Sequence, residues 1–357
     1  MFLDTDNLYF PEPGAKWEAV NPRTVGWDPK KLEALIQFAG EQNSSSFLLL
    51  YRGKILVEKN WEVSPEMGGA NDSLQKMYRY FQRGVNADNC PIEDVASVQK
   101  GLAAILAYMA REKGLLDFDD PVGKHLGVGW SLADEAAEGK ITLRHILTMT
   151  TGLNEQLEFE TEPGKKWFYN TPAYQHVIRV VAAAAAMDYR TLTREWLTGP
   201  IGMNDTTWIE RTGFPKMNKV TMLGLASTAR DLGRLGLLVL AGGRWGMANI
   251  INDCPIFLQM VKPSQHLNPA YGHLWYVNGQ RHYILPQQTS KTDGPLWPAA
   301  PDDTVAALGL FSRCLFVCPA LGLVMTRLGY VPGMALQGGP GFARKLWERL
   351  IAAAPKH

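Results

Sequence analysis

Ser97 and Lys100 are the two residues of this sequence whose types and spacing best suit nucleophilic chemistry. A serine hydroxyl attacks a carbonyl carbon when a neighbouring base takes its proton, and an amine can be that base when burial lowers its pKa. Three residues apart on a helix, the two side chains lie one turn apart on the same face. The spacing therefore allows Ser97 to attack and Lys100 to accept its proton.

The residues that follow predict a helix that starts at Ser97. Apolar residues recur at one-face spacing until Gly114 ends the pattern: Val98, Leu102, Ile105, Leu106 and Met109. At the first turn of a helix the backbone N–H groups are free and the dipole favours negative charge, which suits an oxyanion. The competing interpretation is a helix-capping serine followed by an exposed lysine.

A second Ser-x-x-Lys, from Ser73 to Lys76, shows how easily the bare pattern arises. A chain of this length contains it about once or twice by chance. The residues after it are charged and aromatic and are soon interrupted by Gly84. We therefore predict a surface segment at this second motif.

The composition indicates a globular protein without nucleic-acid or membrane partners. The 357 residues suffice for one large domain or two that share an interface. The 36 basic and 35 acidic residues leave a formal charge of +1, and no basic run is present to follow a phosphate backbone or a lipid surface. Because no signal-peptide pattern opens the sequence and no apolar stretch could span a bilayer, we expect a cytoplasmic protein.

Cysteines and histidines give no sign of a metal or cofactor site. The four cysteines are scattered, which predicts reduced thiols, and Cys314 and Cys318 are expected on one face of a strand as small apolar residues. The seven histidines lack metal-ligand spacing, and no glycine-rich phosphate loop is visible. We expect neither metal nor cofactor, and the sequence does not indicate an oligomeric state.

The order of predicted elements favours an α+β fold. Residues 46–61 predict a β-hairpin around Arg52-Gly53, and strand patterns return at 271–285 and 304–329, the latter turned at 318–322. The middle of the chain is mostly helical. We predict an antiparallel sheet flanked by helices and built from residues 1–100 and 245–357, with a helical domain of residues 101–244 inserted and the active site in the cleft between them.

The segment "ASVQKGLAAILAYMAREKGLLDFDDPVGKHL" resembles the nucleophile segment of the serine β-lactamase and penicillin-binding-protein superfamily. It is most similar to the class C β-lactamase-like branch, which includes family VIII carboxylesterases and nylon-oligomer hydrolases. Similar segments follow in the same order: "ITLRHILTMTTGL", "PGKKWFYNTPAYQ", "ASTARDLGRLGLLVLAGGRW" and "YGHLWYVNG". The resemblance covers residues 45–350 and implies a β-lactamase-like fold with Ser97 as nucleophile and Lys100 as base.

The resemblance also implies a role for Tyr169, which matches the tyrosine of the Tyr-x-Asn motif in this branch. A phenol bonded to the lysine can relay the serine proton to a leaving group, although an ordinary core aromatic is the alternative. The third motif position is Thr171 rather than Asn, and Asn170 stands one place early. We predict substrate contacts for Asn170 and Thr171, with the reservation that a threonine has no amide to offer.

The Lys-Thr-Gly motif of β-lactamases is absent from the strand where the resemblance places it. The aligned strand is "TVAALGLFSRCLFV", in which Gly309 is kept, whereas Lys291-Thr292-Asp293-Gly294 falls in a loop-like stretch. Backbone N–H groups of Ser97 and Leu308 are predicted to form the oxyanion hole. Gly309 and Trp275 are predicted to contact the substrate.

These residues predict a cofactor-free serine hydrolase that cleaves a small-molecule ester or amide through an acyl-enzyme on Ser97. A β-lactamase or DD-peptidase is the first alternative, which the missing basic residue and Thr171 disfavour. The second alternative is a binding protein that keeps the fold without catalysis.

Overall fold

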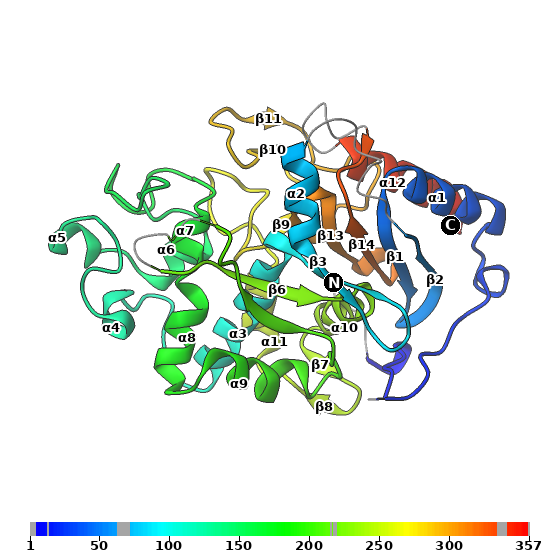
Figure 1. Cartoon of the computed structure of the whole chain (residues 1–357), viewed down its shortest axis with the longest axis horizontal. Coiled ribbons are helices and arrows are strands. Elements are labelled where there is room, and N and C mark those ends of the chain that lie inside the picture. The colour runs from blue at the N-terminus through cyan, green and yellow to red at the C-terminus, as the bar shows by residue number, and fades with distance from the viewer. Residues whose placement is uncertain are drawn as a thin grey trace.

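The main sheet has six antiparallel strands in the order β2-β1-β14-β13-β12-β9, drawn from both ends of the chain (Figure 1). The computed structural model describes residues 5–12, 14–62, 72–214, 216, 220–333 and 341–355. The strands of this sheet are β1 (Ser44–Tyr51), β2 (Lys54–Asn60), β9 (Tyr276–Val277), β12 (Val305–Gly309), β13 (Arg313–Cys318) and β14 (Leu323–Gly329). The prediction of an antiparallel sheet built from both chain ends is confirmed.

Two hairpins of this sheet follow from local turn chemistry. Arg52 and Gly53 both have positive φ, 48° and 84°, which a tight turn between β1 and β2 requires. The turn between β13 and β14 ends at Gly322, whose φ is 61°. Both turns were predicted from the sequence because Gly and Pro mark them.

The predicted strand over 304–317 is interrupted in the structure. Phe311 and Ser312 adopt positive φ values of 61° and 57°, within a short 3₁₀ turn (Leu310–Ser312) that separates β12 from β13. Positive φ is usual for glycine, and neither residue is glycine or proline, so the sequence does not indicate that the chain turns here. The prediction of one continuous strand is therefore wrong, and β12 instead pairs with β13 as an antiparallel neighbour.

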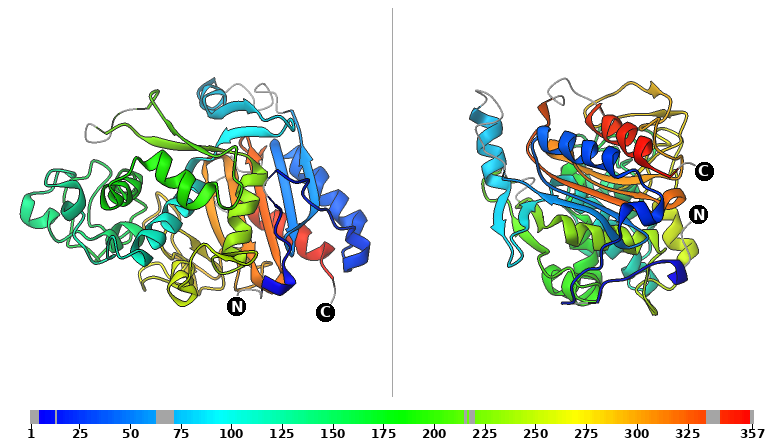
Figure 2. Two further views of the ribbon diagram at one scale, coloured as in Figure 1. Left: turned by 90° about the horizontal axis from the view of Figure 1, so that it is seen from below. Right: turned by 90° about the vertical axis from the view of Figure 1, so that its right-hand side faces the viewer.

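Helices cover both faces of the main sheet (Figure 2). On one face lie α1 (Pro29–Glu41) and α12 (Gly341–Ala353), where Trp347 stacks edge-on against Phe316. On the other face lies α10 (Ala229–Leu240), whose Gly236 approaches Leu315, the neighbour of Phe316. Since successive strand residues point to opposite faces, the sheet is buried on both sides.

A second, four-stranded sheet in the order β3-β4-β6-β5 lies beside the main sheet. Its strands are β3 (Gln82–Val85), β4 (Pro91–Asp94), β5 (Thr207–Glu210) and β6 (Leu223–Ser227), and α2 (Asp72–Phe81) precedes β3. Two-residue strands form two further ribbons, β7 (Arg244–Trp245) with β8 (Ala248–Asn249) and β10 (His282–Tyr283) with β11 (Thr292–Asp293).

The middle of the chain contains most of the remaining helices. They are α3 (Gln99–Glu112), α4 (Gly123–Leu126), α5 (Glu135–Glu138), α6 (Leu143–Leu147), α7 (Thr171–Tyr174), α8 (Val177–Ala185), α9 (Tyr189–Thr193) and α11 (Cys254–Met260). Within the predicted helical span 101–244, β5 and β6 belong to the second sheet and α10 packs on the main sheet. The two-domain division itself stays a prediction.

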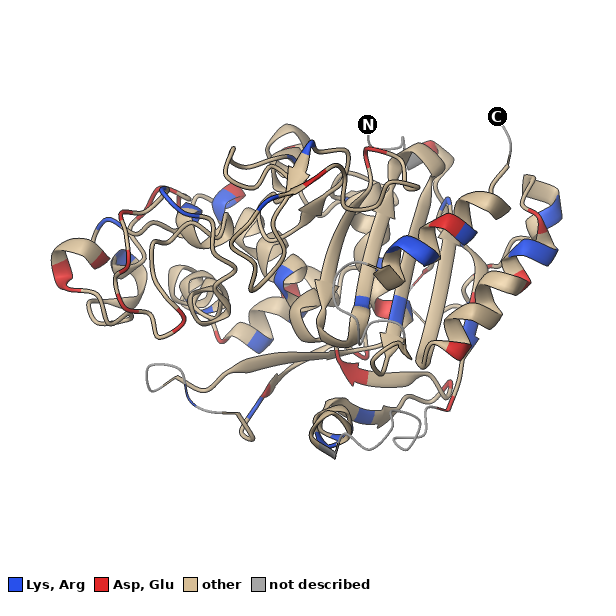
Figure 3. Cartoon of the chain, turned by 90° about the horizontal axis from the view of Figure 1, so that it is seen from above, with Lys and Arg blue, Asp and Glu red and all other residues tan. Residues whose placement is uncertain are grey.

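The distribution of charged residues agrees with the balanced composition. Lys and Arg positions are interspersed with Asp and Glu positions along the ribbon (Figure 3). In the described residues, no helix has the length and hydropathy needed to cross a membrane. All four cysteines are free thiols, and Cys314 and Cys318 are buried on β13 as predicted.

Candidate active site

Ser97 lies in a short 3₁₀ turn (Ala96–Val98) that leads directly into α3. The turn lies between β4 of the second sheet and the apolar helix α3, and both elements fix the position of the serine. Ala96, the residue before the serine, adopts a left-handed conformation with φ of 52°. Ser97 is partly exposed while both of its neighbours are buried, which turns its hydroxyl toward a pocket.

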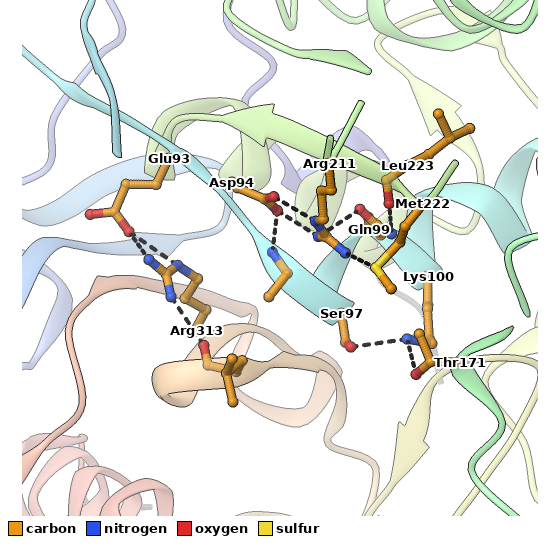
Figure 4. Close-up of polar contacts among 12 residues, drawn as sticks. Glu93, Asp94, Ser97, Gln99, Lys100, Thr171, Arg211, Met222, Leu223 and Arg313 are labelled. Carbon is orange, nitrogen blue, oxygen red and sulfur yellow. Dashed lines mark hydrogen bonds and ion pairs between the residues drawn. The ribbon is translucent and has the colours of Figure 1, made fainter. Parts of the chain in front are cut away.

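The Lys100 amine lies 2.9 Å from the Ser97 hydroxyl oxygen (Figure 4). Lys100 is only 2% exposed, because α3 is buried along most of its length. Burial lowers the pKa of Lys100 well below its usual value, and the positive charge of Arg211 lowers it further. A lowered pKa favours the neutral amine, and a neutral amine that touches the hydroxyl can take its proton.

Two tyrosine rings enclose the Lys100 amine. The ring centres of Tyr169 and Tyr174 lie 4.7 and 4.5 Å from the Lys100 nitrogen. Aromatic faces attract a cation, so they can stabilise the ammonium that forms when Lys100 accepts a proton. Burial raises the pKa of Tyr169 to about 12, and a hydrogen bond with Ser97 partly offsets this effect. Tyr169 is therefore a neutral phenol at ordinary pH, able to donate and accept a proton.

The two residues after Tyr169 have different environments. The Thr171 hydroxyl lies 3.5 Å from the Lys100 amine and lines the pocket. Asn170 is instead 1% exposed; its side-chain amide donates to the carbonyls of Leu153 and Asn154 and accepts from the Ala173 backbone. The prediction that Asn170 contacts substrate is corrected, because these bonds use both of its N–H donors to hold the loop and cap α7.

Leu308 lies on β12 at the edge of the main sheet that faces Ser97. The Asn278 N–H donates to the Thr304 carbonyl, so even-numbered residues of β12 direct their backbone groups toward β9. Because β9 covers only Val305 and Ala306, the backbone of Leu308 faces an open edge. The register is therefore compatible with the predicted oxyanion role of the Leu308 N–H.

A pocket of about 440 Å³ opens above these residues. It is lined from the helical part by Phe168, Tyr169, Thr171 and Pro172, and from the sheet part by Ser97, Tyr276, Leu308, Gly309 and Leu310; Glu155 and residues 285–287 complete it. Gly309 lines this pocket, and a Cβ at that position would lie 2.6 Å from the Val95 carbonyl oxygen; its contact with substrate stays a prediction. Side chains from both parts of the chain thus converge on one cavity.

The prediction that Trp275 contacts substrate is corrected by its burial. Trp275 is 0% exposed and packs beneath α3, where a Cβ on Gly101 would lie 2.9 Å from its ring. Its neighbour Tyr276 lines the pocket instead, because adjacent residues point in opposite directions. Sequence reasoning missed Tyr276, Glu155 and Phe168, which carry no motif of their own.

The two decoy motifs lie away from this pocket. Ser73 and Lys76 are exposed on α2, as the surface prediction required. Thr292 and Asp293 form the exposed strand β11, which pairs with β10 rather than with β12. Within the described residues, no group of three or more His, Cys, Asp or Glu could hold a metal ion.

Two buried ion pairs originate from consecutive residues of β4 (Figure 4). Arg211 bonds both carboxylate oxygens of Asp94 at 2.7 Å, and Arg313 donates to Glu93 at 2.6 and 3.0 Å. Arg313 also donates to the Leu310 carbonyl at 3.2 Å. A buried charge is stable only when a charge of opposite sign and hydrogen bonds compensate it. The two ion pairs therefore fix the positions of these four side chains near the turn that contains Ser97.

Comparison with known proteins identifies the family. Residues 43–330 match the Beta-lactamase family, so the chain belongs to it, and members of this family are serine hydrolases. An uncharacterised protein of Alkalihalophilus pseudofirmus is 22% identical over 84% of this chain and 86% of its own length.

Two solved structures illustrate the fold. EstCE1, described as a hydrolase with promiscuous acyltransferase activity, superposes with a TM-score of 0.60 and 15% identity over 90% of this chain and 98% of its own. A mutant of the simvastatin synthase LovD from Aspergillus terreus has a TM-score of 0.63 and 14% identity over 92% of this chain and 98% of its own. At such identities the likeness concerns the fold, which is that of β-lactamase-like hydrolases and transferases.

Proposed function

We propose that this protein is a serine hydrolase of the esterase or amidase type, with Ser97 as nucleophile, Lys100 as base and Tyr169 as proton relay. The observation that supports this proposal most directly is the 2.9 Å contact between the buried Lys100 amine and the Ser97 hydroxyl. An exposed lysine would be protonated and unable to accept a proton, whereas burial keeps this one available. The capping interpretation of Ser97 does not account for that contact.

The reaction proceeds through an acyl-enzyme. The Ser97 oxygen bonds to the substrate carbonyl carbon while its proton passes to Lys100, and backbone N–H groups of Ser97 and Leu308 stabilise the oxyanion. Tyr169 passes the proton to the departing alcohol or amine as its bond to the carbonyl breaks. Water then attacks the acyl carbon, loses a proton by the same route in reverse, and releases the acid and free Ser97.

The charge of the pocket disfavours an anionic substrate. Among the described residues that line it, Glu155 is the one charged side chain. A substrate carboxylate would find no cationic side chain among these lining residues and would be repelled by Glu155. β-Lactams and peptides ending in D-alanine carry such a carboxylate, so neutral or cationic esters and amides fit the pocket better.

Activity-based labelling tests the proposal. A fluorophosphonate probe is expected to label Ser97, and Ser97→Ala should remove both the label and the hydrolysis of p-nitrophenyl esters. Ser73→Ala is the matched control, because it removes the other Ser-x-x-Lys serine, and it should retain full labelling. Label at another residue, or a chain that takes no label, would contradict the proposal and favour a binding role. Faster turnover of nitrocefin than of simple esters would favour the β-lactamase alternative.

A further inference from the structure

The residue before Ser97 is held in a conformation that it would not adopt freely. Ala96 has φ of 52°, in the left-handed region where a Cβ atom is crowded and where glycine is the usual residue. This turn connects β4 to α3 and contains Ser97. Such a conformation persists only where its surroundings enforce it.

Asp94 contacts Ala96 directly. Its carboxylate oxygen Oδ1 accepts the Ala96 N–H at 2.9 Å, and its side chain is completely buried. Asp94 and Glu93 are consecutive strand residues and therefore point in opposite directions. Glu93 reaches Arg313 on the main sheet, whereas Asp94 reaches the serine turn and Arg211.

Arg211 fixes the Asp94 carboxylate from the far side. It donates through Nε and Nη2 to the two carboxylate oxygens, each at 2.7 Å, in the forked geometry that fixes orientation as well as distance. The same Nη2 lies 3.4 Å from the side-chain oxygen of Gln99. The pair thus contacts Ala96 before the serine and Gln99 after it.

We propose that the buried Asp94–Arg211 ion pair is the positioning device of the active site, which holds Ala96 in its left-handed conformation and so directs the Ser97 hydroxyl at Lys100. The inference rests on the proposed function of Ser97 and assigns its geometry to two residues that touch neither substrate nor the reacting atoms. A forked ion pair resists rotation of the carboxylate better than a single hydrogen bond does, because two bonds must break together.

The charge of Arg211 gives the pair a second effect. Among the described residues, the groups that face the Lys100 amine are the Ser97 hydroxyl, Thr171 and the two tyrosines 169 and 174, with Arg211 and its partner Asp94 at longer range. Both tyrosines have raised pKa values and are neutral near pH 7, so Arg211 supplies the positive charge that disfavours protonated Lys100. Loss of that charge is expected to move the acidic limb of the pH–rate profile to higher pH.

A double-mutant cycle tests the positioning role. Asp94→Asn keeps the size of the side chain but loses the forked ion pair, and it should lower the rate of fluorophosphonate labelling about 100-fold with little change in KM for a neutral ester, as a small misplacement of a reacting group does. Ala96→Gly should restore at least tenfold of this loss, because glycine adopts the left-handed conformation without strain. Alone, Ala96→Gly should change labelling less than threefold.

Additive effects of Asp94→Asn and Ala96→Gly, or a wild-type labelling rate in Asp94→Asn, would overturn the inference. Arg211→Lys provides the same test if Asp94→Asn does not fold. It should slow labelling, because lysine cannot form the two-bond ion pair with Asp94, and Ala96→Gly should restore much of the lost rate. Because lysine keeps the positive charge, the acidic limb of the pH–rate profile should not move. Arg211→Met should also move the acidic limb of the pH–rate profile to higher pH, because it removes the positive charge.

Arg230→Lys is the matched control for loss of a forked ion pair. Arg230 binds both carboxylate oxygens of Glu58 at 2.6 and 2.9 Å but joins α10 to β2, so its replacement should cost stability without slowing labelling. Equal slowing in Arg230→Lys and Arg211→Lys would show a general loss of stability and overturn the inference. If the wild-type protein takes no label, both the proposed function and this inference are wrong. If the wild type is labelled and the Asp94 and Arg211 variants are labelled at the same rate, only this inference is wrong.

Discussion

Gly309 of β12 lies against the carbonyl of Val95, so closely that a Cβ on Gly309 would be 2.6 Å from that oxygen. This contact brings the edge of the main sheet to the turn that carries Ser97. The oxygen belongs to the backbone and cannot rotate away as a side chain would. The separation between the serine and the proposed oxyanion strand therefore depends on the absence of a side chain at position 309.

Gly309→Ala should accordingly displace β12 from the serine turn. A shift of a few tenths of an ångström to one ångström is expected to lower kcat/KM for a neutral ester by about 10- to 100-fold. Steady-state kinetics with p-nitrophenyl esters measure this effect. Gly123→Ala is the control, because a Cβ there meets nothing within 4 Å, and it should keep wild-type activity. Equal kinetics for the two variants would contradict the proposed role of this strand.

Lys100→Met should abolish hydrolysis yet stabilise the fold at neutral pH. Burial lowers the pKa of Lys100 below its unfolded value of 10.5, so between the lowered pKa and 10.5 the unfolded chain binds more protons. The free energy of unfolding of the wild type therefore rises with pH across that window. The stability advantage of Lys100→Met should shrink as pH approaches 10.5.

Thermal unfolding followed between pH 6 and about pH 10 measures this linkage. Lys76→Met is the matched control, since it removes the exposed lysine of the other Ser-x-x-Lys on α2, and it should not reproduce the stabilisation expected for Lys100→Met. A Lys100→Met variant whose advantage is independent of pH would show that Lys100 stays protonated in the folded chain.

Tyr169→Phe should lower kcat by about 10²- to 10⁴-fold, the usual contribution of a positioned acid or base. Because burial raises the pKa of Tyr169 to about 12, the phenol stays neutral through the alkaline range. The wild-type rate should rise as Lys100 loses its proton and then stay level to about pH 10. A descending limb near pH 8 would require another ionising group.

Tyr174→Phe is the matched control for the Tyr169 variant. Its ring faces the Lys100 amine at a similar distance, 4.5 Å, and phenylalanine retains that ring face. If the hydroxyl of Tyr169 relays the proton, Tyr174→Phe should keep most of the activity. Equal losses in the two variants would indicate that the rings act only by packing.

Glu155→Gln should alter the preference for substrate charge. The wild type should favour acetylthiocholine over its neutral isostere 3,3-dimethylbutyl thioacetate by about fivefold in KM, which corresponds to roughly 1 kcal/mol of attraction at a solvated site. Glu155→Gln should remove that difference and leave turnover of the neutral ester unchanged. Glu135→Gln on α5 removes an exposed carboxylate outside the pocket and should change neither value.

The local sequence predicted the elements of the site because helices and tight turns depend on short-range patterns. The apolar periodicity after Ser97 marks α3, Lys100 falls one turn away on its buried face, and Arg52-Gly53 marks the hairpin of β1 and β2. Burial of that helix then suffices to lower the pKa of Lys100. The pairing of serine and lysine could therefore be anticipated from a single segment.

Only the tertiary structure decided which other residues surround this pair. Asn170 and Trp275 were predicted to contact substrate, but one caps α7 and the other packs beneath α3, because side-chain direction depends on the exact backbone path. Arg211 lies 117 residues from Asp94 in sequence, and no local pattern signals their contact. The turn at Phe311 and Ser312 is likewise unmarked by glycine or proline. Short-range preference sets helices and turns, whereas the positions of long-range partners follow from packing of the whole chain.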